Sequence, residues 1–222
     1  SQNNILSPND FSESINSDIQ NSNEASALIY VHGFNESYER SVIRASQISY
    51  DLAFPGSTFI FSWPARNSVT TYLGDLQRAR DSERYFELFM SQILSTTSTN
   101  RIYIIAHHMG GRIVSAVLKH MFSIQPSYKD RIREIILIAP DMEVYQFTEQ
   151  FTNFIGTQNA PTTLYASVND PSLAVSKKFS TNRLVGDAVG QLLISATVET
   201  INAGTTDLSL NGHSNYTDTS SI

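Results

Sequence analysis

An apolar run followed by two adjacent histidines and two glycines is the part of this chain best suited to chemistry. Ala106-His-His-Met-Gly110 follows the apolar run 101–106 and precedes residues with helical periodicity. A sharp turn between a strand and a helix needs small residues beside its central residue, because the two backbones approach closely there. The central residue has positive φ and presents its side chain, which is usually a nucleophilic serine. Here that position holds His108, and histidine is among the non-glycine residues that tolerate positive φ comparatively well.

The segment Tyr30-Val-His-Gly-Phe-Asn-Glu36 ends an earlier strand-like run and is a candidate anion-binding turn. A His-Gly turn in this place commonly directs backbone N–H groups at a developing oxyanion, together with the N–H of the residue after the nucleophile. The matching donors are the backbone N–H groups of Phe34 and Met109, and Asn35 is a candidate substrate-binding side chain. In the alternative interpretation the turn only ends a strand and Asn35 caps the next helix, and the two interpretations are compatible.

A candidate acid and a candidate base follow the elbow along the chain. Triads on such elbows run in the order nucleophile, acid, histidine. Asp170 follows the strand-like run 163–167, and His213 is the sole histidine beyond it, in a loop-like segment. These two residues are predicted to be the orienting carboxylate and the catalytic base. Asp141 is the rival acid, but it is better suited to capping a helix that starts near Met142.

Two aromatic residues are further substrate-binding candidates. Trp63 and Tyr72, with Phe34 and Met109, would form an apolar rim for an acyl or aryl group, and ordinary core packing is the alternative. Residues 142–160 carry phenylalanines at helical spacing, which are expected either in the core or in a small cap over the site.

Short apolar runs alternate with helical periodicity along most of the chain, which predicts an α/β fold with a doubly wound, mostly parallel sheet. In such sheets function gathers at the carboxyl ends of the strands, where most of the candidates above fall. We expect a single domain over residues 25–217, a loosely packed polar lead-in over 1–24 and a polar tail over 218–222. The strand-like runs are 27–32, 58–62, 101–106, 134–139 and 163–167, with a weaker one near 196–201.

Composition narrows the class of protein. The chain has 222 residues, 41% of them hydrophobic, which is enough for one sizeable core. A net charge of −6 without a basic stripe argues against a nucleic-acid partner. The absence of cysteine excludes disulfides and thiolate sites, and no apolar run is long enough to span a bilayer. We expect a soluble cytoplasmic or periplasmic protein that acts on a small molecule and needs no cofactor and no metal.

The ordered set of motifs resembles a bacterial family of α/β-hydrolases catalogued largely as a domain of unknown function. The resemblance covers about residues 26–217. It implies a compact α/β-hydrolase core, a nucleophile at position 108, an acid at Asp170, a base at His213 and an oxyanion hole near Phe34. The family usually reads Ala-His-Ser-Met-Gly at the elbow, so His108 stands where the family has serine. The motifs are Val31-His-Gly-Phe-Asn35, Phe61-Ser-Trp-Pro-Ala-Arg66, Tyr72-Leu-Gly-Asp75, Ala106-His-His-Met-Gly110, Ala139-Pro-Asp141, Ser167-Val-Asn-Asp170 and Gly212-His-Ser-Asn-Tyr216.

Three explanations of His108 remain open. In the first the imidazole fills the site and the enzyme is inactivated, leaving only the contribution of the oxyanion hole and of binding. In the second His108 is itself the nucleophile, and His213 activates a water for deacylation. In the third His108, His213, His32 and Asp170 hold a metal, although adjacent histidines at 107 and 108 point in different directions.

Two functions of different class follow from these explanations. The first is a serine-hydrolase-type enzyme acting on carboxylic esters with short or medium acyl groups, which His108 leaves inactive or weakly active. The second is a non-catalytic protein that uses the same scaffold to bind a small ligand or a partner.

Overall fold

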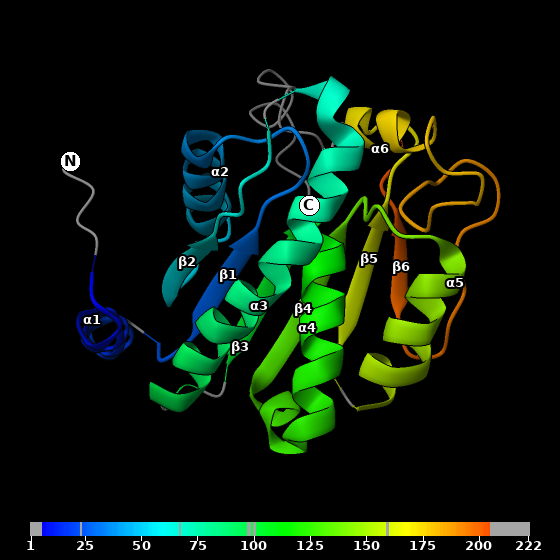
Figure 1. The fold of residues 1–222 in the computed structure, drawn as a ribbon. Helices are drawn as coiled ribbons and strands as arrows, with labels where there is room; N and C mark the ends of the chain where they lie inside the picture. The colour runs from blue at the N-terminus through cyan, green and yellow to red at the C-terminus, as the bar shows by residue number, and fades with distance from the viewer. Residues whose placement is uncertain are drawn as a thin grey trace.

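A computed structural model describes residues 6–22, 24–66, 68–96, 99, 101–158 and 160–204. Within them, parallel strands form one sheet in the order β2-β1-β3-β4-β5-β6 (Figure 1). Each strand lies within a few residues of a predicted apolar run, so the doubly wound, mostly parallel sheet is confirmed. The strands are β1 (Ala27–Val31), β2 (Ser57–Phe61), β3 (Ile102–His107), β4 (Ile132–Ile138), β5 (Thr162–Ala166) and β6 (Glu199–Asn202).

Helices alternate with the strands, as expected for right-handed crossover connections. The α-helices are α1 (Pro8–Asn21), α2 (Tyr38–Asp51), α3 (Tyr72–Thr96), α4 (Gly110–Ile124), α5 (Val144–Phe147) and α6 (Pro171–Ser176). The shorter 3₁₀ segments are η1 (Val69–Thr71), η2 (Pro126–Arg131) and η4 (Gly156–Gln158), and a π-helical segment, η3 (Thr148–Ile155), continues α5.

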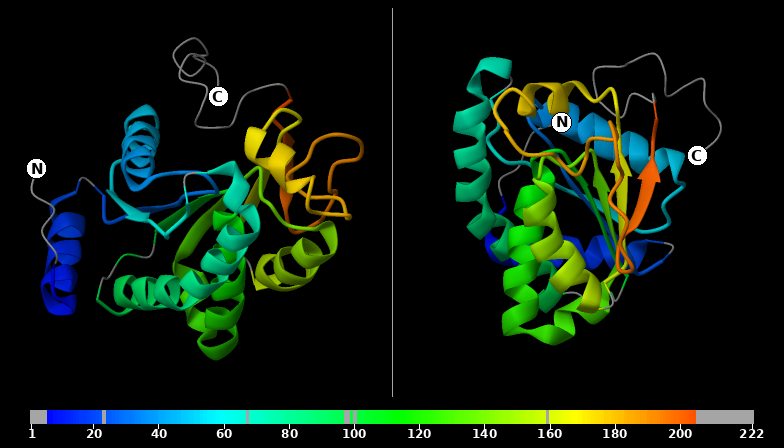
Figure 2. Two further views of the ribbon diagram at one scale, coloured as in Figure 1. Left: turned by 45° about the horizontal axis from the view of Figure 1, so that its top comes forward. Right: turned by 90° about the vertical axis from the view of Figure 1, so that its right-hand side faces the viewer.

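The two faces of the sheet are covered unequally (Figure 2). Ile29 and Ile104 belong to the large core that α3, α4 and α5 close on one face. Their strand neighbours Tyr30 and Ile105 point the other way and pack with Ala45 of α2 in a smaller cluster. This alternation follows from the two-residue period of a strand. Burial on both faces also explains why β1 and β3 read as nearly continuous apolar runs.

The N-terminal segment packs more closely than its polar composition suggested. Ser7 caps α1, and the side chains of Ile15 and Ile19 are almost completely buried in the large core. Phe11 also contacts Phe89 of α3, with ring centroids 6.1 Å apart. The expectation of a loosely packed lead-in is therefore wrong for this helix, because three apolar residues at helical spacing are enough to dock it.

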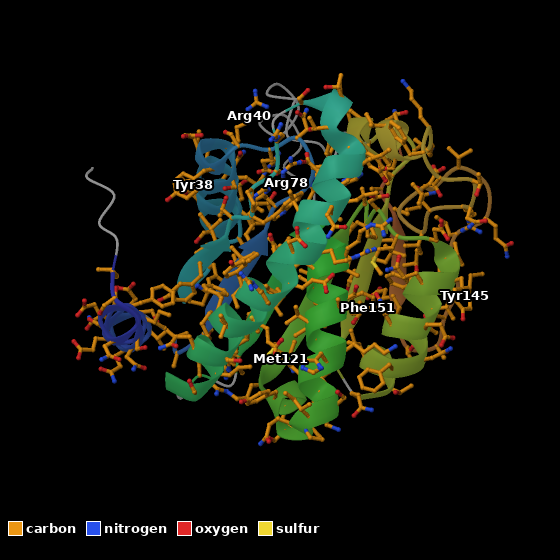
Figure 3. The ribbon with its side chains drawn as sticks, in the orientation of Figure 1. Tyr38, Arg40, Arg78, Met121, Tyr145 and Phe151 are labelled. Atoms are coloured by element: carbon orange, nitrogen blue, oxygen red, sulfur yellow. The ribbon has the colours of Figure 1, made fainter. Side chains whose placement is uncertain are left out.

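Residues 142–160 contribute to the core on the α4 side of the sheet. Phe147 and Phe151 are fully buried and stack on each other, with ring centroids 4.9 Å apart. Figure 3 shows Phe151 directed toward α4, whereas Tyr145 projects outward from α5. Of the two interpretations of the phenylalanine spacing, the structure supports core packing.

The carboxyl ends of β1, β3, β4 and β5 lie along one edge of the sheet, where the arrowheads point in Figure 1. The connections after these strands carry the candidate site residues, as expected for a doubly wound sheet. Across the described ranges, no helix has both the length and the apolar character needed to cross a membrane.

Candidate active site

The predicted elbow is present between β3 and α4. His108 has φ of 49° and α4 begins at Gly110, one residue after the N-cap Met109. A Cβ atom on Gly110 would lie 2.5 Å from the carbonyl oxygen of Val31, and one on Gly33 would lie 2.7 Å from Nδ1 of His107. Contacts this short are forbidden, so both glycines are required by the close approach of the elbow to the end of β1.

The imidazole of His108 is completely buried and its Nε2 atom lies 2.8 Å from Oγ of Ser176. The Ser176 hydroxyl also donates to the carbonyl of Ser172 at 3.2 Å, so its oxygen is left to accept from Nε2–H. Nδ1 has no hydrogen-bond partner among the described residues. Burial lowers the pKa of His108 to about 4, although the charges of Asp141 and Asp170 oppose the shift. His108 is therefore neutral at pH 7.

Asp170 contacts the other histidine of the elbow. Its Oδ2 atom lies 3.2 Å from Nε2 of His107, and its Oδ1 atom accepts the backbone N–H of Leu173 at 2.9 Å. Burial alone would raise the pKa of Asp170, but the His107 hydrogen bond, the nearby imidazoles and the Leu173 N–H together lower it to about 2. The predicted partner, His213, lies outside the described residues.

The helix-capping argument that ranked the two acids is reversed by the structure. Asp170 is the N-cap of α6, whereas the N-cap of α5 is Glu143 and not Asp141. Asp141 is fully buried and its Oδ2 atom accepts the hydroxyl of Tyr72 at 2.9 Å. Arg112 places its Nε atom 3.5 Å from the same oxygen. The carboxylate of Asp141 therefore belongs to a buried network beneath the elbow.

Two backbone N–H groups beside His108 are left without acceptors. Phe34 and Met109 are both buried, and neither N–H donates a hydrogen bond to any residue in the described part of the chain. Buried N–H groups are rarely orphaned, so such a pair is a candidate binding point for an anionic oxygen. The turn that carries Phe34 continues through Asn35, whose φ is 58°, and the adjacent Gly33 N–H lies 3.4 Å from Oε2 of Glu36.

A family model described as "Alpha/beta hydrolase of unknown function (DUF900)" matches residues 7–213. The chain belongs to the DUF900 family of α/β-hydrolases. None of the curated proteins matches it significantly. The matched range includes the elbow, the turn after β1 and Asp170, and it ends at His213.

Several solved structures show a distant likeness to this DUF900 protein. A predicted CIB-like hydrolase from Thermoplasma acidophilum is 17% identical, with a TM-score of 0.43 over 83% of this chain and 78% of that one. An esterase from Pyrobaculum calidifontis is 10% identical, with a TM-score of 0.44 over 82% and 67% of the two chains. Esterase 2 from Thermogutta terrifontis is 11% identical, with a TM-score of 0.42 over 82% and 72%.

His32 and Trp63 support the turn after β1 in this DUF900 protein. The backbone N–H of Trp63 donates to Nε2 of His32 at 3.0 Å, so the ring proton is on Nδ1, which lies 2.9 Å from the Gly33 carbonyl. The indole N–H of Trp63 donates to the carbonyl of His32 at 2.8 Å, and the two rings stack. Burial lowers the pKa of His32 to about 4, despite hydrogen bonds that favour its charged form. The contacts of Trp63 are thus with His32, which shapes the turn.

Tyr72 contacts Phe34, which lies beside the elbow. Its ring meets the Phe34 ring edge-on at 5.5 Å and stacks on Phe179 at 4.9 Å, while Phe34 lies 5.9 Å from the His108 ring. Burial raises the pKa of the Tyr72 hydroxyl, and the charge of Asp141 adds to the effect. Asn35 is half-buried, and the helix it was thought to cap has Ser37 as its N-cap instead.

The sequence did not single out Ser176 or Arg112 in this DUF900 site. Ser176 is one of several serines in its region, and its contact with His108 joins positions far apart along the chain. No group of three or more His, Cys, Asp or Glu side chains in the described ranges is placed to hold a metal ion. His32, a member of the metal set considered above, has both ring nitrogens engaged by its own turn and by Trp63.

Proposed function

We propose that this protein is an α/β-hydrolase for carboxylic esters whose nucleophile position is occupied by His108. The observation that carries the proposal is the pair of buried, acceptor-free N–H groups of Met109, the next residue along the chain, and of Phe34, whose ring lies 5.9 Å from that of His108. Such a pair suits the oxygen of a tetrahedral intermediate, because it is already oriented and removed from water. Asp170 and His213 are assigned as the acid and the base that serve the same position.

The chemistry is simplest to state for a His108→Ser variant. The introduced hydroxyl attacks the ester carbonyl carbon and gives its proton to His213, which Asp170 orients. The carbonyl oxygen becomes an oxyanion held by the N–H groups of Phe34 and Met109. His213 then protonates the departing alcohol, and a water activated by His213 releases the acid.

His108 itself blocks this sequence in the chain as it stands. Its side chain has no exposed surface, and its Nε2–H is committed to Ser176. The imidazole is larger than a hydroxymethyl group and occupies the space beside the two N–H groups. We therefore assign little or no turnover to this chain, with a residual rate from binding and the oxyanion hole alone.

A histidine nucleophile is the narrower alternative within the same proposal. With Nε2 bound to Ser176, attack on an ester would have to come from Nδ1, which has no hydrogen-bond partner in the described part of the molecule. The product of attack would be an acyl-imidazole, which His213 would clear by activating water. Neutral His108 has the lone pair that this step requires.

Short or medium acyl esters are the proposed substrate class. Phe34 and Tyr72 form an apolar wall next to residue 108, and Phe179 closes it from outside. Asn35 is the nearest half-buried polar side chain on the same turn. Trp63 contributes by holding the turn rather than by lining the wall.

The test compares ester hydrolysis by the native chain, His108→Ser and His108→Ala. p-Nitrophenyl acetate, butyrate and decanoate serve as substrates, and pre-steady-state experiments with substrate in excess record any burst of p-nitrophenol. We expect His108→Ser to raise kcat/KM by at least about 10³-fold on the short esters, because a lost nucleophile removes most of the rate. His108→Ala is the matched control, since it empties the site without adding a nucleophile. Equal activity of the Ser and Ala variants would refute the assignment.

A non-catalytic binding protein is the second candidate, and the complete burial of His108 favours it. This function predicts that the native chain binds a small ligand but does not turn over esters. Turnover by the native chain that His213→Ala abolishes would exclude it.

A further inference from the structure

His107 is a buried titratable residue that the proposed reaction does not use. It is the last residue of β3, directly before His108, and it is almost fully buried. Side chains alternate along a strand, so His107 shares the face of Ile105, which packs in the smaller cluster, whereas Ala106 belongs to the large core. Burying an imidazole costs free energy unless a partner satisfies it, so the contacts of this ring indicate what it does.

The partner of His107 is the carboxylate of Asp170. Nε2 of His107 lies 3.2 Å from Oδ2 of Asp170, and neither side chain is appreciably exposed. The carboxyl group of Asp170, with its pKa lowered to about 2, is ionised at pH 7 and can only accept a hydrogen bond. Nε2 of His107 therefore carries a proton and donates it to an ionised acceptor, which makes a stronger bond than a neutral pair would.

The contact with His107 fixes how the carboxylate of Asp170 is turned. Its Oδ1 atom accepts the backbone N–H of Leu173 at 2.9 Å, as the N-cap of α6. A contact on one oxygen leaves the plane of a carboxylate free to rotate, whereas a second contact on the other oxygen holds that plane. A carboxylate has about four lone-pair sites, so it can still accept a hydrogen bond from the catalytic base.

The other edge of the His107 ring packs against the turn after β1. A Cβ atom on Gly33 would lie 2.7 Å from Nδ1 of His107, so the ring abuts the glycine directly. Gly33 precedes Phe34, whose N–H is one of the two proposed oxyanion donors. In the sheet β3 lies between β1 and β4, and β5 follows β4, so this ring connects the end of β1 with the segment after β5.

A second buried carboxylate lies beyond Gly33. Oε2 of Glu36 is 3.4 Å from the backbone N of Gly33 and 3.4 Å from the hydroxyl of Tyr30. Burial raises the pKa of Glu36, and the nearby imidazole of His107 opposes the shift. Nδ1 of His107 nevertheless has no hydrogen-bond partner among the described residues. The hydrogen bonding of the ring is thus directed at Asp170.

We propose that His107 is a positioning residue of the hydrolytic site, which holds the carboxylate of Asp170 in place relative to the turn that carries the Phe34 N–H. This inference rests on the proposed function, which assigns Asp170 and Phe34 their roles. His107 acts on Asp170 through its Nε2–H and on the turn through its packing against Gly33. Displacing either group weakens interactions made in the transition state more than it weakens binding of the ester, so the effect falls on kcat rather than on KM.

Two substitutions of similar size in the His108→Ser background separate the hydrogen-bond donor from the volume of the ring. His107→Leu removes the donor and should lower kcat for p-nitrophenyl butyrate by about 10²-fold, with KM changed by less than about threefold. His107→Gln keeps an N–H donor and should retain kcat to within about fivefold. Ile132→Ala is the matched control, because it opens a cavity at the amino end of β4, at the opposite edge of the sheet. It should lower the melting temperature and leave kcat and KM unchanged.

A spectroscopic test of the contact does not depend on activity. In the native chain labelled with ¹⁵N-histidine, Nε2 of His107 should be protonated near pH 7, and His107→Gln assigns the signal. Asp170→Asn should move the Nε2 proton resonance upfield, because a neutral acceptor binds that proton less strongly.

Three results would overturn the inference while the proposed function stands. One is a His107 ring whose Nε2 is unprotonated, and another is an active His108→Ser chain in which His107→Leu lowers kcat no more than Ile132→Ala does. The third is equal loss of kcat with His107→Leu and His107→Gln, which would show that the donor has no role. A His108→Ser chain without activity refutes the proposed function, and this inference with it.

Discussion

Nε2 of His108 and Oγ of Ser176 lie 2.8 Å apart, and this contact joins the elbow to the C-terminal end of α6. The N-terminal end of the same helix is joined to the elbow by Asp170, which contacts His107 at 3.2 Å. The two adjacent histidines therefore contact α6 at both of its ends. One of the two contacts that join α6 to the elbow is therefore made by the imidazole at position 108.

Ser176→Ala should lower stability in the native chain and have little effect in a His108→Ser background. Removing the acceptor leaves the Nε2–H of His108 buried without a partner, which costs about 1–3 kcal/mol. Urea denaturation of the two single variants and the double variant gives the coupling energy between the positions. Strictly additive effects would show that the Ser176 contact does not stabilise the fold.

Stability should fall as the pH is lowered from about 6.5 to about 4. Burial lowers the pKa of both His108 and His32 to about 4, from 6.5. The unfolded chain therefore binds more protons in this window, so the native state is fully favoured above it and loses stability toward pH 4. His108→Gln should reduce the slope of unfolding free energy against pH by about 1.4 kcal/mol per unit. Burial raises the pKa of Glu36, which acts in the opposite direction but equally in both proteins.

The control for this pH experiment is Leu52→Gln, at a side chain 60% exposed that has no ionisable group. Its slope should match that of the native chain. If His108→Gln also leaves the slope unchanged, the imidazole of His108 does not titrate with folding and the neutral form assigned to it is wrong.

Substitutions of the two buried acids, Asp170 and Asp141, should have different effects on kcat in a His108→Ser background. Asp170→Asn should lower kcat by about 10²–10⁴-fold, because the carboxylate orients and stabilises the catalytic imidazole. Asparagine is as good an N-cap as aspartate, so α6 should remain in place. Asp141→Asn should change kcat by less than tenfold but lower the melting temperature, since Tyr72 and Arg112 lose a charged partner. The reverse order of kcat effects would make Asp141 the catalytic acid.

A glycine-to-alanine substitution should destabilise the protein at the elbow but not within an ordinary helix. Gly110→Ala should destabilise the protein by more than about 1–3 kcal/mol, because its Cβ would lie 2.5 Å from a backbone oxygen that cannot move freely. Gly74→Ala, within α3, should be neutral or stabilising by up to about 1 kcal/mol, because alanine favours helix. The nearest atom to that Cβ is Nη1 of Arg78, 3.0 Å away at the far end of a long side chain. Equal melting temperatures for the two variants would contradict a tight elbow.

The sequence alone determined the parallel sheet, the positions of its strands and the elbow at residue 108. Local sequence patterns predict these features: continuous apolar runs, helical periodicity, and small residues on both sides of a turn. The requirement for Gly110 also followed from local reasoning, because strand and helix must approach closely wherever such a turn occurs.

Only the tertiary structure decided which polar side chains meet. His108 pairs with Ser176, Asp170 with His107 and Asp141 with Tyr72, and each pair joins segments far apart along the chain. The packing of α1 through Ile15 and Ile19 could not be predicted from the sequence either, because a short amphipathic stretch does not reveal which surface it will cover. Spacing along a chain encodes the face of a helix or strand. The partner across a buried interface is set by how those faces pack, because most buried polar groups form a hydrogen bond with whichever group the packing brings within reach.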